Sequence, residues 1–442
     1  MLSYYFRLGL GKLRSHPALT ALMVLTLAVG VATCVATLSV LQMVSKNPIP
    51  HKSARLISLV IDNATLQNYQ PGEKLEEQQM TYRDSINLLA ARPADLPNLR
   101  RTAIYGISEG IEPARPDLPV LEVTGLATTP DFFAMFEVPM LYGSIWSQEQ
   151  ERTGADVVVL SKKQAQTLFG AGNPVGKRMR MAKNEFQVIG VIDEWHPFPR
   201  YTHLINGNGG AFNGADEIFM PLTTAIRLKM GASGSTHCGQ GRGPGFHGLL
   251  DSECTWIQFW FELPAATDLP KLQNFMQNYA REQKKLGRLQ RPDPARLFDV
   301  MGWLQYLEVV DRDNKLAVWL SFGFLLLCLV NTVGLLLAKF STRAAEVGVR
   351  RALGASRMEI FKQFLHETLV VGLAGAVCGV PLALLVLEWI TATSFSKAVL
   401  PQISWSVLGL TVLLSLVASV LAGLLPIWRA SNTTPALQLK SQ

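Results

Sequence analysis

The sequence lacks a nucleotide-binding motif. The segment AGNPVGKR, Ala171–Arg178, resembles a phosphate-binding loop, but it has alanine in place of the first glycine and arginine where serine or threonine would contact Mg²⁺. We interpret it as a turn between a helix and a strand. The chain is therefore not expected to hydrolyse ATP by itself, and we expect no cofactor and no metal on it.

The sequence also lacks basic clusters interleaved with aromatic residues, and it lacks charges within its long apolar segments. The net charge is +7, but no basic cluster is interleaved with aromatic residues, which excludes nucleic acid as an expected partner. The long apolar segments contain no ionisable residue, so they make a poor route for a hydrophilic substrate through a bilayer. Their polar residues are neutral and are expected to hydrogen-bond between helices. Those residues are Thr20, Thr26, Thr33, Thr37, Asn331 and Thr332, and Asn331 is the candidate contact across a dimer.

Cysteine is also rare. Three of the five cysteines lie in apolar segments, and only Cys238 and Cys254 lie between them. This pair can form a disulfide in an oxidising compartment. A metal site with His237 and His247 is an alternative, although H-C-x8-H-x6-C matches no common zinc spacing, and two free thiols are a third possibility.

Apolar residues are abundant, at 48% of the chain, which indicates a membrane protein. Four apolar segments are long enough to cross a bilayer as helices: 17–45, 316–338, 368–388 and 403–427. They carry no charge up to Leu387 in the third segment, whose last residue is Glu388. A cleaved signal peptide is the alternative for the first, but that segment is too long and has no convincing cleavage site before Lys46.

The flanking charges predict how the chain crosses the membrane. Residues 1–16 form a basic amphipathic segment suited to the membrane surface. The positive-inside bias puts both termini, the elbow at 339–367 and the tail at 428–442 in the cytoplasm. The region 46–314 and the short loop 389–402 are then outside, which in a bacterium is the periplasm or the extracellular space.

The region 46–314 has the pattern of a mixed α+β domain. Expected strands are 54–62, 120–126, 186–192 and 255–263, expected helices are 74–91, 131–143 and 268–287, and 156–170 reads as a strand followed by a helix. An apolar stripe from Leu297 onward predicts a helical stalk over about 296–315 that leads into the second span. The glycine-rich segment 203–254 predicts long loops with an undetermined role.

The elbow carries sharp local signals. A short helix over Ala344–Leu353 has an i,i+4 ion pair and a glycine placed to end it. A serine three residues before a glutamate then forms a capping box for a second helix, which continues into the third span. These residues are Glu346, Arg350, Gly354, Ser356 and Glu359.

The sequence AEVGVRRALGASRMEIFKQFLHETLVVGLAGAVCGVPL resembles the signature of ABC-transporter permeases of the MacB and FtsX type. The region 46–314 is similar to the MacB periplasmic core domain in its F-F pair, LSKKQAQTLFGAGNPVGK, VIGVI and FMPL, and LPIWRASNTTPALQL is similar to the closing motif of the family. The resemblance implies four membrane helices with a large periplasmic α+β domain between the first two. It also implies that the elbow is a coupling helix for a separate ATPase, through Glu346, Gly348, Arg350, Arg351, Leu353, Gly354 and Ala355.

The resemblance implies a permease of the bacterial inner membrane that is not itself an enzyme. Two copies of a separate ATPase would carry ATP and Mg²⁺, and their hydrolysis would move the outer domain so that it pushes a substrate into an adaptor and an outer-membrane duct. The expected partners are a second permease, identical or paralogous, a periplasmic adaptor and the lipid bilayer. The alternatives are an FtsX-like relay that controls a cell-wall hydrolase and LolCE-like lipoprotein extraction, and the length of the outer domain favours export over the relay.

Overall fold

The structure is a computed structural model that describes residues 17–431 apart from 68, 73, 76–77, 113–118, 206–209, 213, 240, 311 and 395–404. The predicted surface segment 1–16, most of the loop 389–402 and the tail after Ser431 lie outside the described residues. The chain forms two compact units. Residues 46–309 form the inserted unit, and the segments on either side of them in the sequence form the membrane unit.

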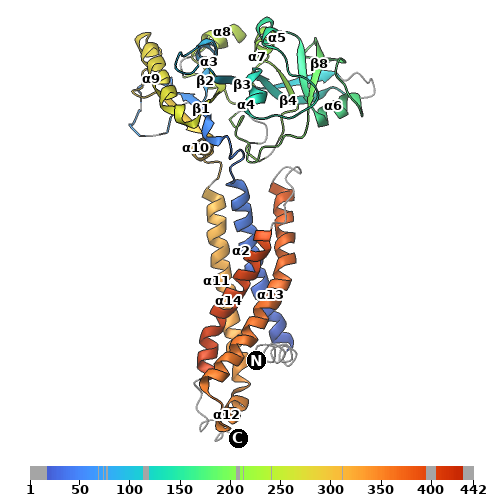
Figure 1. Ribbon diagram of the computed structural model, residues 1–442, viewed down its shortest axis with the longest axis vertical. Coiled ribbons are helices and arrows are strands. Elements are labelled where there is room, and N and C mark those ends of the chain that lie inside the picture. Colours follow the sequence, from blue (N-terminus) through green and yellow to red (C-terminus); the bar gives the residue numbers. More distant parts are fainter. Residues whose placement is uncertain are drawn as a thin grey trace. The chain divides into compact units, whose positions relative to one another are not determined.

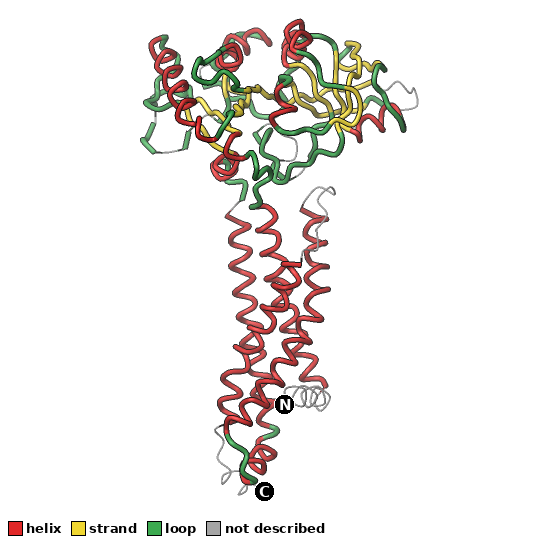
Figure 2. Tube along the Cα trace, in the orientation of Figure 1, coloured by secondary structure: helices red, strands yellow, loops and turns green. Residues whose placement is uncertain are grey.

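Long helices make up the membrane unit (Figures 1 and 2). They are α2 (Pro17–Val44), α11 (Arg312–Ser341), α13 (Arg357–Ser394) and α14 (Trp405–Ser431), with the short α12 (Ala344–Ala352) between α11 and α13. Among the described residues, these four long helices are the ones with the length and hydropathy to cross a membrane. Each of them overlaps one of the four predicted spans, but α13 begins before its span and continues into 389–394, which were predicted as the start of a loop.

Helix α13 packs closely against α2 and α14. A side chain added at Gly372 would collide with Ser419 of α14, and one added at Gly375 would press on Leu27 of α2. Ser415 of α14 donates a hydrogen bond to the Gly372 carbonyl at 2.7 Å. Glycine therefore lets these helix backbones approach closely, as is common in membrane bundles.

Hydroxyl groups join α2 to α11. Thr37 donates to Ser321 Oγ at 2.8 Å, and the Thr26 and Thr332 hydroxyls lie 3.4 Å apart. The prediction of hydrogen bonds between helices is confirmed for Thr26, Thr37 and Thr332. Thr33 instead donates to the Val29 carbonyl of its own helix.

The inserted unit is built on one large mixed sheet with the strand order β11-β1-β10-β3-β4-β9-β6-β8-β5. Strand β2 pairs with β10, and β7 pairs with β3 and β8. The β4–β9 and β6–β8 pairs are parallel and the others are antiparallel. The strands are β1 (Leu56–Ile61), β2 (Met80–Thr81), β3 (Arg100–Glu112), β4 (Leu121–Thr128), β5 (Met140–Gly143), β6 (Val157–Ser161), β7 (Arg178–Met181), β8 (Asn184–Ile192), β9 (Ile218–Pro221), β10 (Thr255–Glu262) and β11 (Ala295–Asp299).

Helices cover this sheet on both faces, so the mixed α+β prediction is correct (Figure 1). They are α3 (Tyr82–Ala90), α4 (Asp131–Met135), α5 (Gln148–Thr153), α6 (Lys162–Phe169), α7 (Leu222–Arg227), α8 (Gly245–Asp251), α9 (Leu269–Lys285) and α10 (Val300–Tyr306), with 3₁₀ turns at Ser53–Arg55 and Ala266–Asp268. Strand β10 is buried at every position. Phe259 and Trp260 point to opposite faces and belong to separate apolar clusters, so the unit has a core on each side of its sheet.

Two expected helices are shorter than predicted. The helix predicted over 74–91 begins only at Tyr82, because Thr81 caps it by accepting a hydrogen bond from the Asp84 backbone, and 80–81 pair with β10 as β2. The helix predicted over 131–143 ends at Met135, where the chain turns toward β5. The segment Ala171–Arg178, which resembles a phosphate-binding loop in sequence, forms the predicted turn between α6 and β7.

The expected stalk helix over 296–315 is wrong in its first part. Residues 295–299 form β11, which pairs antiparallel with β1. Asp299 then caps the short α10 by accepting a hydrogen bond from the Gly302 backbone at 2.7 Å, and the helix ends at Tyr306. The chain leaves the helical conformation before α11 begins, so α10 and α11 are separate helices.

Candidate functional site

Helix α12 is stabilised by an ion pair between its own side chains and is ended by backbone hydrogen bonds at its C-terminus. Glu346 and Arg350 form the expected i,i+4 ion pair at 2.8 Å. At the other end, the Ala355 backbone donates to the Arg350 carbonyl at 3.0 Å, and the Gly354 backbone donates to the Arg351 carbonyl at 3.2 Å. This is the Schellman arrangement, and Gly354 has the positive φ of 101° that it requires.

The predicted capping box that starts α13 is present. The Glu359 backbone donates to Ser356 Oγ at 3.2 Å, and the Ser356 backbone donates to Glu359 Oε2 at 2.9 Å. Helix α13 then continues without a break from Arg357 to Ser394. Because the first turns of α13 and the part of its apolar span before Pro381 belong to one unbroken helix, a displacement at its start is carried into the span.

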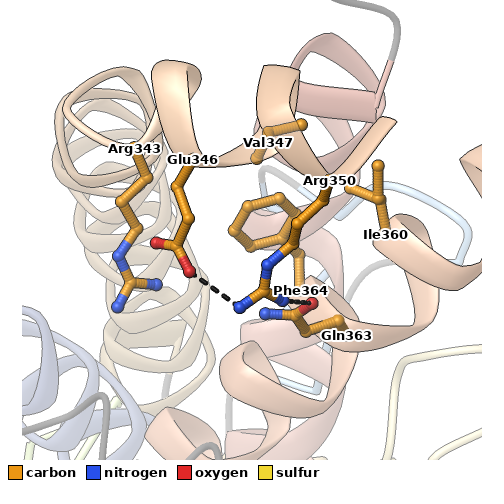
Figure 3. Close-up of a pocket in the computed structure, with 7 residues that line it drawn as sticks. All are labelled: Arg343, Glu346, Val347, Arg350, Ile360, Gln363 and Phe364. Carbon is orange, nitrogen blue, oxygen red and sulfur yellow. Dashed lines mark hydrogen bonds and ion pairs between the residues drawn. The ribbon is translucent and has the colours of Figure 1, made fainter. Parts of the chain in front are cut away.

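One face of α12 is held against α13. Val347 is buried in an apolar cluster with Ile360 and Phe364, and Arg350 donates to Gln363 Oε1 at 2.7 Å. Figure 3 shows these side chains around a small pocket between the two helices. Its lining residues are Arg343, Glu346, Val347, Arg350, Ile360, Gln363 and Phe364.

The opposite face of α12 exposes apolar side chains. Val349 is 51% exposed and Leu353 is 83% exposed, and Met358 at the start of α13 is 61% exposed. We call Val349, Leu353 and Met358 the exposed patch. Gly348 is buried, whereas Arg351 is half-buried and reaches the Ser431 carbonyl at the end of α14 at 3.5 Å. The predicted coupling residues therefore divide between a face held by the bundle and a face left open.

A buried group of charges that was not predicted from the sequence lies beside α12. Lys339 of α11 lies 2.8 Å from Glu367 Oε1, and the Arg343 guanidinium lies 2.8 and 3.1 Å from the two Glu367 oxygens. Lys339 is 0% exposed, and the other two are also buried. We call these three residues the buried triad. The sequence did carry a signal for this contact. Lys339 and Arg343 come just after one apolar run and Glu367 comes just before the next, so all three lie at the same depth.

The other predicted site residues lie elsewhere. Cys238 and Cys254 form a disulfide in the inserted unit, so their thiols are not free to bind a metal. The described residues contain no group of three or more His, Cys, Asp or Glu side chains that could hold a metal ion. Asn331 is exposed on the surface of α11, while its neighbour Thr332 is buried against α2.

Four helices long and apolar enough to cross a membrane, a mixed sheet domain inserted after the first of them, and a short helix at the turn between the second and third define a multi-pass membrane protein. Two family models match the chain: the MacB-like periplasmic core domain over residues 20–277 and the FtsX-like permease C-terminal region over residues 318–435. The chain therefore belongs to the MacB/FtsX-type ABC transporter permeases, as the sequence resemblance predicted.

Individual relatives are distant in sequence. The macrolide export ATP-binding/permease protein MacB of Rhodospirillum rubrum is 25% identical over 98% of this chain and 59% of its own length. The pyoverdine export ATP-binding/permease protein PvdT of Pseudomonas fluorescens is 25% identical over 96% of this chain and 57% of its own. The periplasmic region of MacB from Actinobacillus actinomycetemcomitans aligns with 59% of this chain and 95% of its own, at 11% identity and a TM-score of 0.36. The chain thus spans roughly half the length of the curated relatives it matches.

Proposed function

We propose that this chain is the permease subunit of an ABC transporter in which ATP hydrolysis on a separate ATPase subunit drives substrate export. The exposed patch carries the proposal. It presents apolar side chains on α12, just after its end and at the start of α13, while the other face of α12 is fixed to α13. An exposed apolar patch of this kind is suited to a protein interface. The names of the relatives that align along nearly the whole chain, which describe export ATP-binding/permease proteins, favour export.

The ATPase would receive α12 as a helix in a groove. In this mode, apolar residues about one turn apart act as anchors, and Val349 and Leu353 have that i,i+4 spacing. Two ATPase copies would carry ATP and Mg²⁺, one beneath each permease. The present chain would then supply no catalytic group and would act by mechanotransmission.

A second permease would bind the exposed side of α11. Asn331 presents a side-chain amide there, and a side chain added at Gly323 or Gly334 would meet no atom within 4 Å. In a bilayer, small residues let helices approach and a polar amide favours a hydrogen-bond partner on a neighbouring helix. The second copy is either identical to this chain or a paralogue.

We place the permease in a bacterial inner membrane with both termini in the cytoplasm. The elbow has an excess of cations, which the positive-inside bias assigns to the cytoplasmic side. The inserted unit is then in the periplasm, where an adaptor protein leading to an outer-membrane duct would receive the substrate. A relay to a cell-wall hydrolase and the extraction of a lipoprotein would use the same motor with a different periplasmic partner.

The proposal is tested by purifying the tagged chain from its native membranes and measuring the ATPase that remains bound. Val349→Glu and Leu353→Glu each place a charge in the exposed patch and should abolish co-purification of the ATPase. Leu286→Glu is the matched control, because Leu286 is an exposed leucine of the inserted unit. Equal recovery of the ATPase with all three variants would exclude the exposed patch as its docking surface.

The same purification distinguishes the three functions. Export requires a periplasmic adaptor among the bound proteins. Recovery of a cell-wall hydrolase without an adaptor would make the chain a signal relay, and recovery of a lipoprotein substrate without an adaptor would favour extraction. Two differently tagged copies of the chain that purify together would establish a homodimer, and Asn331→Leu should weaken their association.

A further inference from the structure

The buried triad joins three successive helical segments at one point. Lys339 belongs to the last turn of α11, Arg343 is the residue before α12, and Glu367 lies in α13. Both cations contact the same carboxylate, at 2.8 Å for Lys339 and at 2.8 and 3.1 Å for Arg343. A change in the position of any one segment therefore changes a contact that the other two share.

Helix α12 is also held at its other end. Arg350, in its last turn, donates to Gln363 of α13 at 2.7 Å. Between the two polar contacts, Val347 packs on Ile360 and Phe364. The centroid of the Phe364 ring lies 4.3 Å from the centroid of the Phe340 ring in α11. The helix is thus fixed at both ends and along its buried face. Only a few residues connect it to α11 and to α13.

The chemistry of the triad suits positioning better than stabilisation. A buried ion pair adds little net stability, because desolvation offsets the attraction between the charges, and its best-attested role is to specify how the groups that it joins are arranged. Replacing the carboxylate by an amide would leave two buried cations without their shared counter-charge. An apolar contact in the same place would hold the helices together while still allowing them to slide.

We propose that Glu367 is a positioning residue that locks α11, α12 and α13 into one rigid body, so that a displacement of α12 moves both membrane helices together. This inference deepens the proposed function, since it relies on α12 being the segment that the ATPase displaces. The carboxylate does not contact the ATPase in this scheme. It determines whether force applied at the exposed patch reaches the membrane helices.

The first test uses the purified full-length chain without any ATPase. Cys378→Ser removes the exposed thiol of α13, and spin labels are attached at Ala352→Cys and Lys362→Cys, both exposed positions, one on each helix. The lock predicts a narrow distribution of label-to-label distances in this background. Glu367→Gln should broaden the distribution, and Glu367→Asp, which keeps the charge, should restore much of its sharpness. An equally narrow distribution with Glu367→Gln would overturn the proposal.

A matched control and a second variant keep the test decisive. Glu359→Gln makes the same chemical change in the same helix, but glutamine also serves in a capping box, so the distribution should stay narrow. If the Glu367→Gln variant does not reach the membrane, a double variant, Lys339→Met with Glu367→Gln, is used instead. It removes one of the two buried cations together with the carboxylate. This double variant should broaden the distribution as well, and a narrow one would overturn the proposal.

The second test separates the lock from the proposed function. In the complex purified with its ATPase, Glu367→Gln should leave the amount of bound ATPase unchanged, because the exposed patch is intact. It should reduce the effect of the permease on the ATP hydrolysis rate by roughly tenfold, within the usual range of coupling between sites. Loss of ATPase binding with Glu367→Gln would contradict the positioning role. If the wild-type chain binds no ATPase, the proposed function fails, while the spin-label result still decides the lock.

Discussion

Arg350 donates one hydrogen bond to Glu346 within α12 and another to Gln363 in α13, at 2.8 and 2.7 Å. One guanidinium therefore supports the short helix and attaches it to the membrane helix beside it. Arg350 is only half-buried, so its contacts should contribute more to the position of α12 than to the stability of the chain.

Replacing Arg350 tests whether its contacts contribute more to the position of α12 than to the stability of the chain. Arg350→Ala should lower the free energy of unfolding by about 1 kcal/mol or less, but it should markedly reduce the stimulation of ATP hydrolysis in the purified complex. Glu346→Lys should act in the same direction, because it places a second cation beside Arg350. Lys362→Ala, at an exposed position of α13, is the control. Unchanged stimulation with Arg350→Ala would show that this contact does not take part in coupling.

Gly354 should tolerate no side chain. Its φ of 101° is strained for any residue with a Cβ, so Gly354→Ala should cost roughly 1–2 kcal/mol and loosen the end of α12. Trypsin added to inverted membrane vesicles should then cleave faster in the elbow at Arg350, Arg351 and Arg357. Gly409→Ala, within helix α14, should leave the cleavage rate unchanged, because a side chain added there meets no atom within 4 Å. Equal cleavage rates for the two variants would contradict the role assigned to Gly354.

The disulfide should stabilise the inserted unit. Cys238 and Cys254 are 16 residues apart, and closing a loop of that size contributes about 3 kcal/mol in the chain-entropy model. The double variant Cys238→Ala, Cys254→Ala should lower the unfolding midpoint in denaturant, and reducing agent should have no further effect on it. Cys378→Ala should remain like wild type, since that thiol lies in α13 outside the disulfide. A wild-type midpoint that does not respond to reducing agent would count against the pairing.

Asp216 should make the inserted unit sensitive to acid. Burial alone would raise the pKa of this carboxyl, but the charge of Arg200, 2.8 Å away, together with the contact to His203 outweighs burial and lowers its pKa from 3.8 to about 2. Because the folded pKa is lower than the unfolded one, the stabilising contribution is complete above about pH 4 and is lost as the pH falls toward 2.

Asp216→Asn separates this effect from general acid denaturation. At neutral pH, the variant leaves Arg200 buried beside a neutral amide, so unfolding should become easier by roughly 3–5 kcal/mol. Its stability should also decline less steeply than that of wild type between pH 4 and pH 2, as followed by tryptophan fluorescence. Asp193→Asn, at a solvent-accessible pair with Lys162, should keep the wild-type profile. Parallel pH profiles for Asp216→Asn and wild type would exclude Asp216 as the source.

Local signals in the elbow were sufficient to predict its helices. Gly354 ends α12 through contacts within six residues, and Ser356 starts α13 through a residue three positions away. The buried triad could not be derived in this way. Arg343 and Glu367 are 24 residues apart, and their contact depends on how closely α11 and α13 approach each other.

In the inserted unit, too, local sequence signals were not sufficient to predict the structure. Strand β3 was not predicted, because RRTAIYGISEGIE mixes charges and glycines, yet pairing with β10 and β4 on its two sides makes it the longest strand among the described residues. The apolar spacing over 296–307 fitted a helix, but a sheet edge at β1 takes its first residues as β11. Pairing with a distant strand thus overrode the local periodicity.

The insertion of residues 46–309 between α2 and α11 has a consequence for biosynthesis. A ribosome adds roughly 5–20 residues per second, so α2 enters the membrane tens of seconds before α11 exists. Throughout that interval, Thr37 has no Ser321 to donate to. Its hydroxyl can bond to the Thr33 and Cys34 carbonyls of its own helix, at 3.0 and 3.1 Å, and Ser39 bonds to the Val35 carbonyl at 2.7 Å. Helix α2 therefore carries its own hydrogen-bond acceptors while the ribosome synthesises the residues between α2 and α11.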